Sequence, residues 1–173
     1  MNKYNKILTI YIALLLTSCA TYTPRYKVEN YDETLPNNPI EKTFYLVGDA
    51  GNASMNKSTE GLLLLEKVLD TAKTKGDYLI ILGDNIYQKG MPKKDAPDRA
   101  LSEHKIDVQI QAAKKFEGDM IFIPGNHDWY DNGLLGLARQ EKYVQKKTKS
   151  KKTFLPAKGC PIESIEVSEN VHL

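Results

Sequence analysis

The residues best suited to chemistry follow three short apolar runs, each of which ends in a glycine. Gly48-Asp49, Gly83-Asp84 and Gly125-Asn126 come directly after FYLV, YLIIL and MIFIP. If such runs form a parallel sheet, their carboxyl ends meet at one edge, so two carboxylates and an amide oxygen converge there. Oxygen ligands of this kind suit Mg²⁺, Mn²⁺, Fe or Zn²⁺, and carboxylates gathered at an apolar edge need a cation to offset their charge. The pattern therefore predicts a metal site.

The blocks around these residues resemble the GDxG, GDN and GNHD motifs of the calcineurin-like metallophosphoesterases. They read Gly48-Asp49-Ala50-Gly51, Gly83-Asp84-Asn85 and Gly125-Asn126-His127-Asp128, and the resemblance covers about residues 42–132. One such block alone is a weak signal, whereas three in this order, each after an apolar run, form a strong one. The resemblance implies a metal-dependent hydrolase of phosphoric esters whose fold is a four-layer α/β/β/α sandwich.

A finer resemblance concerns Gly51 and Tyr87. Most of this superfamily has a histidine two places after the first aspartate, where this chain has Gly51. The purple (tartrate-resistant) acid phosphatase branch also has glycine there, and it has a tyrosine three places after the second aspartate, as Tyr87 follows Asp84. A phenolate favours Fe³⁺, so the resemblance implies Fe³⁺ plus a divalent ion such as Fe²⁺, Zn²⁺ or Mn²⁺. The alternative is that Tyr87, one of ten tyrosines, only packs.

The resemblance assigns the metal ligands residue by residue. Asp49 and Tyr87 would bind the first metal, Asp84 would bridge both metals, and Asn126 would bind the second. Two metals about 3.5–4 Å apart activate a water that attacks the phosphorus of a phosphomonoester. No serine or cysteine nucleophile is then required, and the sequence has no P-loop, G-x-G-x-x-G or G-x-S-x-G motif.

Two further residues of the third block would assist the reaction. His127 would contact the phosphate or protonate the leaving alcohol, since histidine is the side chain that most often serves as a general acid or base. Asp128 would orient His127 through a hydrogen bond. Both are expected to be catalytic residues of the site.

The elements that position these residues form an α/β succession. Strands are predicted over 44–47, 78–82 and 120–124, and a last strand-like run over 165–173. One helix is capped by Ser58 or Thr59, and two more are predicted over 99–116 and 134–147. Strand, helix, strand, helix, strand predicts right-handed crossovers and a parallel sheet covered on both faces. This is the N-terminal half of the implied sandwich.

The N-terminus has the pattern of a bacterial lipoprotein signal. Lys3 and Lys6 precede ten almost wholly apolar residues, too short to span a bilayer stably, and Leu16-Thr17-Ser18-Cys19 resembles a lipobox. A plain signal peptide or a weak membrane helix is the alternative. We expect residues 1–18 to be a signal, Cys19 to carry the lipid, 19–40 to be a flexible tether and 41–173 the phosphoesterase part. The chain would be anchored to a membrane of the cell envelope, the outer membrane being favoured.

Charge and length complete the expectations. With 24 Lys+Arg against 22 Asp+Glu, the chain lacks the clear excess of basic residues that is typical of nucleic-acid-binding proteins, so no nucleic-acid partner is expected. The sequence leaves the oligomeric state open. The lysine-rich segment 142–152 is interpreted as a solvated helix end, with attraction to phosphate or anionic lipid as the alternative. The family's site needs further histidines beyond His127, so we expect the domain to be truncated here. A non-catalytic, lipid-anchored envelope remnant or interaction module is the alternative function.

Overall fold

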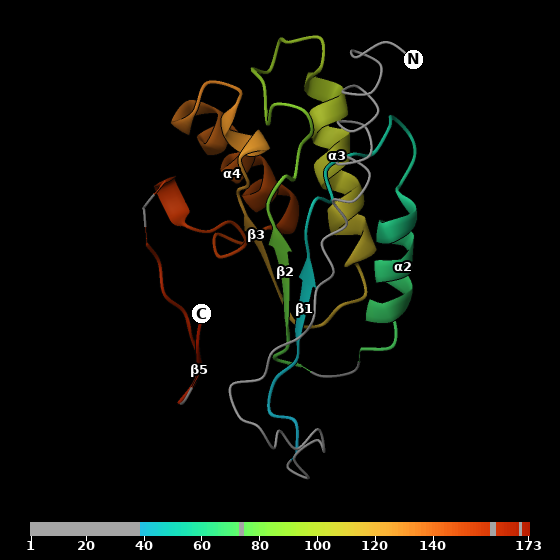
Figure 1. The fold of residues 1–173 in the computed structure, drawn as a ribbon, viewed down its shortest axis with the longest axis vertical. Helices are drawn as coiled ribbons and strands as arrows, with labels where there is room; N and C mark the ends of the chain where they lie inside the picture. Colours follow the sequence, from blue (N-terminus) through green and yellow to red (C-terminus); the bar gives the residue numbers. More distant parts are fainter. Residues whose placement is uncertain (1–38, 73–74, 160–161, 170) are drawn as a thin grey trace, which may run out of the picture. The chain divides into compact units, whose positions relative to one another are not determined.

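The computed structural model describes residues 39–72, 75–159, 162–169 and 171–173. The predicted lipid anchor Cys19, the signal and most of the tether lie outside the described residues. Figure 1 shows the strands β1 and β2 pointing the same way, toward the loops that lead into α2 and α3. No helix in the described part of the chain is long and apolar enough to cross a membrane.

A three-stranded parallel sheet forms the centre of the fold, with the strand order β1-β2-β3. The strands are β1 (Phe44–Val47), β2 (Tyr78–Leu82) and β3 (Asp119–Ile123). Leu46 pairs with Ile80, and Ile80 pairs with Ile121, so these three side chains share one face. The predicted strands are confirmed to within one residue, because each is an apolar run that ends at a glycine or proline turn.

Three helices accompany the sheet: α2 (Glu60–Leu69), α3 (Arg99–Ala112) and α4 (Leu134–Thr148). Thr59 caps α2, since its side chain accepts a hydrogen bond from the backbone N–H of Leu62 at 3.3 Å. Helix α3 ends four residues before the predicted Phe116. There the chain turns, and Phe116 packs edge-on against Tyr45 of β1, with ring centroids 5.6 Å apart.

All three helices pack on the same face of the sheet, which corrects the expectation that helices cover both faces. Leu79, Ile81 and Phe122 point into one core with buried side chains of α2, α3 and α4. When successive parallel strands are added in one direction, right-handed crossovers place every connecting helix on the same side. Helices on both faces would require the strand order to reverse.

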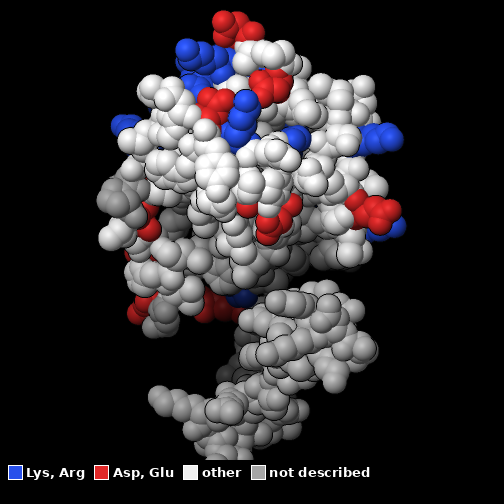
Figure 2. All heavy atoms as spheres, turned by 45° about the horizontal axis from the view of Figure 1, so that its top comes forward, with Lys and Arg blue, Asp and Glu red and all other residues white. Residues whose placement is uncertain are grey.

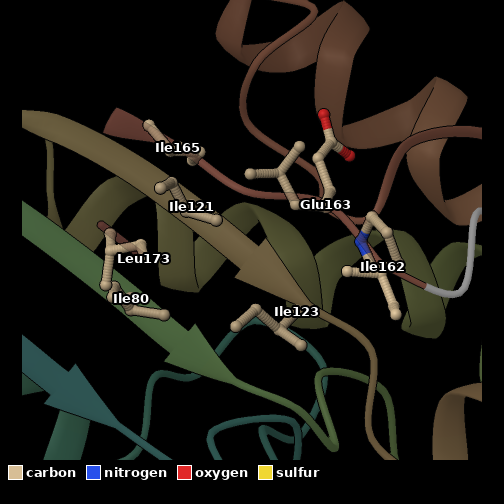
Figure 3. Close-up of a pocket in the computed structure, with 9 residues that line it drawn as sticks. Ile80, Ile121, Ile123, Ile162, Glu163, Ile165 and Leu173 are labelled. Carbon is tan, nitrogen blue, oxygen red and sulfur yellow. The ribbon is translucent and has the colours of Figure 1, made fainter. Parts of the chain in front are cut away.

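The opposite face of the sheet meets the C-terminal segment. Ile80 and Ile121 form a second apolar cluster with Leu155, Ile165 and Val167. Figure 3 shows Leu173 beside Ile80 of β2 and Ile165 beside Ile121 of β3, with Ile123 at the end of β3. These residues line an apolar pocket of ≈ 370 Å³.

The C-terminal segment forms a hairpin, so the prediction of one continuous strand over 165–173 is wrong. Strands β4 (Glu166–Ser168) and β5 (Val171–His172) pair antiparallel. Just outside these two strands, the backbone N–H of Leu173 donates to Ile165 O at 2.9 Å and the backbone N–H of Ile165 donates to Leu173 O at 3.0 Å. A period-two apolar pattern does not reveal where a short strand folds back on itself.

Candidate active site at the carboxyl ends of the strands

The hydroxyl of Tyr87 lies between two predicted ligand carboxylates. It hydrogen-bonds to Asp49 Oδ1 and, at 2.9 Å, to Asp84 Oδ2. Both bonds favour the protonated phenol, so Asp49 first and Asp84 second raise the pKa of Tyr87 above its ordinary value. The structure thus brings together three of the four predicted ligands, which follow β1 and β2.

Asp84 also connects the loop that follows β2 (the second loop) with the loop that follows β3 (the third loop). Its Oδ1 accepts the backbone N–H of His127 at 3.1 Å, while Oδ2 accepts the Tyr87 hydroxyl. One carboxylate therefore holds groups from the loops that follow β2 and β3. Because Asp84 is only partly buried, its oxygens stay close to the surface of the sheet edge. Figure 2 brings the upper end of Figure 1 forward and shows acidic and basic side chains interspersed over it.

Both strand-end aspartates have a strained backbone. Asp49 has φ 54° and Asp84 has φ 51°, in the left-handed region that side-chain-bearing residues seldom adopt. This conformation costs about 1–2 kcal/mol per residue, although Asp tolerates it better than most. Such strain persists where the surrounding structure imposes it, and it is concentrated at functional sites. The turns aim both carboxylates at Tyr87.

Gly51 stands where the backbones of two loops meet. Its N–H donates to Asp84 O at 3.0 Å, and its carbonyl accepts the N–H of Tyr87 at 3.0 Å. A Cβ at position 51 would lie 2.3 Å from the carbonyl carbon of Asn85. No side chain fits there, histidine included, which gives a physical reason for glycine at this position.

The imidazole of His127 is held by a backbone carbonyl. Its Nδ1 lies 2.6 Å from Gln88 O, and a carbonyl only accepts, so Nδ1 carries the hydrogen. The ring also packs against Tyr87 and Tyr130, with centroids 4.4 and 4.9 Å away. In the neutral ring Nε2 then carries a lone pair, so Nε2 can take up a proton and, once protonated, give it to another group.

Asp128 has a different position from the one predicted. It is fully buried, and its two oxygens accept five N–H groups at 2.8–3.1 Å, which come from Asn85 (two), Ile86, Gly125 and Gln140. Gln88 rather than Asp128 orients the His127 ring. Burial raises the pKa of Asp128 and opposes the effect of these hydrogen bonds. Asp128 therefore joins the second and third loops to α4.

Asn126, the fourth predicted ligand, is exposed at the start of the third loop. Its Nδ2 donates to the hydroxyl of Tyr130 at 2.6 Å, which leaves Oδ1 for a metal. The sequence-based prediction assigned no role to Tyr130. Its position four residues after Asn126, across one short helical turn, was the available signal.

A buried lysine binds the backbone of Tyr87, and the sequence-based prediction did not include it. The Nζ of Lys105 on α3 donates to the backbone carbonyl of Tyr87, and only 7% of Lys105 is exposed. Burial lowers its pKa. A lysine in the middle of an amphipathic helix is normally exposed, so nothing in the sequence singled it out.

The donor set fits a hard cation. In the parts of the chain that the structure describes, no group of three or more His, Cys, Asp and Glu side chains could hold a metal ion. The strand-end site instead offers carboxylate, phenol and amide oxygens, and hard cations prefer such oxygens. Asp49, Asp84 and Tyr87 already meet, so they are the residues that would hold a metal.

Comparison with known proteins gives one match. A family model described as calcineurin-like phosphoesterase matches residues 42–166, a range that contains every candidate residue of this site. No curated protein and no solved structure matches the chain.

Proposed function

Since this chain belongs to the calcineurin-like phosphoesterase family, we propose that it is a metal-dependent hydrolase of phosphomonoesters, of the acid phosphatase type. The observation that carries the proposal is the Tyr87 hydroxyl held between the carboxylates of Asp49 and Asp84. Gly51 and Tyr87 together favour the purple acid phosphatase branch. We propose Fe³⁺ with a divalent ion as the metal pair.

The chain's own residues divide the work. Asp49, Asp84, Tyr87 and Asn126 would hold the metals, which supply a lowered pKa for bound water and charge stabilisation for the phosphoryl group. The Tyr87 hydroxyl, which donates to the carboxylates of Asp49 and Asp84, would have to release its proton to solvent in order to become a ligand beside them. Gln88 O holds the hydrogen on Nδ1, so Nε2 of His127 is the atom that takes up a proton from solvent, and the imidazolium so formed would give that proton to the leaving alcohol.

The test is hydrolysis of p-nitrophenyl phosphate by the iron-loaded 173-residue chain. Asp84→Asn removes the carboxylate that holds Tyr87 and His127, so we expect the rate to fall at least about a hundredfold. Asp95→Asn, on an exposed loop, is the matched control and should keep full activity. If Asp84→Asn keeps full activity, the proposed site is wrong.

The metal assignment has its own readout. A tyrosinate bound to Fe³⁺ absorbs visible light, so the loaded chain should be coloured and Tyr87→Phe colourless. An active, colourless protein containing zinc would contradict the iron assignment and leave the phosphoesterase proposal standing.

A non-catalytic, lipid-anchored module is the second candidate. The observation that favours it is the small set of ligating groups gathered at the strand ends, where the described residues provide two carboxylates, one phenol and one amide. This candidate predicts that the chain folds without metal and that the metal-loaded chain does not hydrolyse the ester. It also predicts that Asp84→Asn leaves the fold intact.

We also propose that Cys19 carries a lipid and anchors the chain in the cell envelope, with the outer membrane favoured. The support is the order of residues before Cys19: basic residues come first, then an apolar stretch, and then small residues. Labelled palmitate should enter the wild-type chain and not Cys19→Ala. Incorporation into both would contradict the assignment.

A further inference from the structure

A basic cleft of ≈ 590 Å³ lies between α3, α4 and the loop before α3. Six cationic side chains line it: Lys94, Arg99, Arg139, Lys142, Lys146 and Lys147. Glu103 is the one acidic residue in its lining. None of these residues belongs to the strand-end site. The cleft therefore gathers positive charge in a part of the molecule to which the proposed hydrolysis assigns nothing.

The two arginines of the cleft are fixed by hydrogen bonds. Arg99 donates through Nε to Glu103 Oε1 and through Nη1 to Pro92 O, each at 2.7 Å. Arg139 donates through Nε to Met91 O at 2.9 Å and through Nη2 to Asp131 Oδ1 at 2.8 Å. A guanidinium has five N–H donors, so each retains donors for a ligand. Because the side chains are already ordered, binding incurs little further loss of conformational entropy.

The lysines of α4 add charge that is only partly neutralised. Lys147 pairs with Asp107 at 2.8 Å and lies over the ring of Tyr143. Lys142 and Lys146 lie one turn apart and are exposed, and no described carboxylate lies within ion-pair distance of either. Like charges spaced i, i+4 on a helix are destabilising. An anion placed between them would relieve this repulsion.

We propose that this basic cleft binds the phosphate groups of an anionic ligand. Fixed guanidinium groups match the geometry of phosphate oxygens, and flexible lysine ammonium groups add charge from the side. The cleft is larger than a single ion needs, so it has room for the rest of a ligand beside its phosphate. Two sources have this chemistry, a soluble polyphosphate and the headgroup of an anionic phospholipid.

The first experiment titrates pyrophosphate into the full chain by calorimetry, in EDTA so that no metal occupies the strand-end site. We expect one site per chain, with affinity that falls steeply as salt is added. Lys142→Glu with Lys146→Glu should weaken binding at least about tenfold, because each surface lysine contributes about fivefold. Both lysines are exposed, so the variant should keep the wild-type unfolding midpoint.

The second experiment uses flotation with vesicles of phosphatidylglycerol or of phosphatidylcholine. Preference for phosphatidylglycerol that disappears in the same double variant supports the cleft with a lipid headgroup as its ligand. Lys151→Glu with Lys152→Glu is the matched control, since it makes the same charge change outside the cleft.

The outcomes separate cleanly from those of the proposed function. Loss of pyrophosphate or phosphatidylglycerol binding in the cleft variant alone supports the proposal, and Asp84→Asn should leave that binding unchanged. Equal losses in the cleft and control variants would show attraction by general charge and overturn it. Absence of binding to both pyrophosphate and phosphatidylglycerol would overturn it as well.

Discussion

At the scale of single residues, hydrogen bonds decide which atoms face a ligand. Three groups illustrate this. Tyr87 is shared by two carboxylates, His127 has its Nδ1 on Gln88 O, and Asn126 has its Nδ2 on Tyr130. For His127 and Asn126 the partner fixes one atom and leaves another, Nε2 or Oδ1, available for a proton or a metal, whereas for Tyr87 the two carboxylates hold the one oxygen that would bind a metal. The chemistry of this site therefore depends on residues outside the family motifs.

Tyr130→Phe tests this dependence directly. Without the hydroxyl at 2.6 Å, the amide of Asn126 loses the partner that orients its Oδ1, so affinity for the second metal should fall about tenfold. The measurement is titration with Zn²⁺ followed by calorimetry. Trp129→Phe, a conservative change at a neighbouring, 41% exposed residue, should bind Zn²⁺ like the wild type. Unchanged affinity in Tyr130→Phe would remove Tyr130 from the site.

At the scale of elements, the strands and helices were largely predictable and the loop contacts were not. Apolar runs such as 78–82 mark strands because both faces of β2 are covered by side chains. The end of α3 was misplaced because Phe116 turns back onto Tyr45, a contact distant in sequence. Tertiary contacts of this kind leave no periodic signal.

The candidate site shows the same division. The pairing of Gly51 with Tyr87 was visible in the sequence, and their backbones are hydrogen-bonded. The position of Asp128 was not visible, because adjacency in the chain does not tell which way a side chain points. Its oxygens are directed into the loops, away from the neighbouring His127 ring.

Asp128→Asn should destabilise the fold. An amide in place of the carboxylate turns an N–H₂ group toward buried donors that need an acceptor, at a cost of about 2–4 kcal/mol. Urea unfolding monitored by circular dichroism measures the loss. Asp95→Asn, which is exposed, should unfold like the wild type. If Asp128→Asn is as stable as Asp95→Asn, the five hydrogen bonds contribute little.

Tyr143 links α3 to α4 and should make their packing sensitive to high pH. Its hydroxyl donates to Asp107 Oδ1 at 2.9 Å, and burial, aided by Asp107, raises the pKa of Tyr143 to about 12. The unfolded chain ionises this phenol near pH 10, whereas the folded chain keeps the proton until about pH 12. The stability that the phenol contributes is therefore complete below pH 10 and is lost as pH rises to about 12.

Tyr143→Phe removes both the bond and the titration. Near neutral pH the variant should be less stable by about 1 kcal/mol, the usual value of one hydrogen bond. Between pH 10 and 12 this difference should shrink, because only the wild type loses stability from that phenol. Urea unfolding at a series of pH values measures it. A difference that stays constant up to pH 12 would contradict the assignment.

At the scale of the whole described unit, the sheet has two unequal faces. Three helices cover the face that includes Leu79 and Ile81, whereas the C-terminal segment covers the other only in part. Leu46 is 59% exposed and Leu82 is 49% exposed, and both lie on that second face beside the apolar pocket. An apolar sheet surface in water favours association.

Leu46→Lys with Leu82→Lys should therefore reduce association without unfolding the chain. The wild type should bind a fluorescent apolar dye and sediment as concentration-dependent oligomers, whereas the variant should bind less dye and sediment as a monomer. The unfolding midpoint should change little, because both leucines are already half exposed. Leu63→Lys with Leu64→Lys is the matched control, since these leucines of α2 are 48% and 64% exposed on the helical side. If both variants lose association equally, exposed leucine anywhere on the surface is sufficient, and the partly covered sheet face has no special part in it.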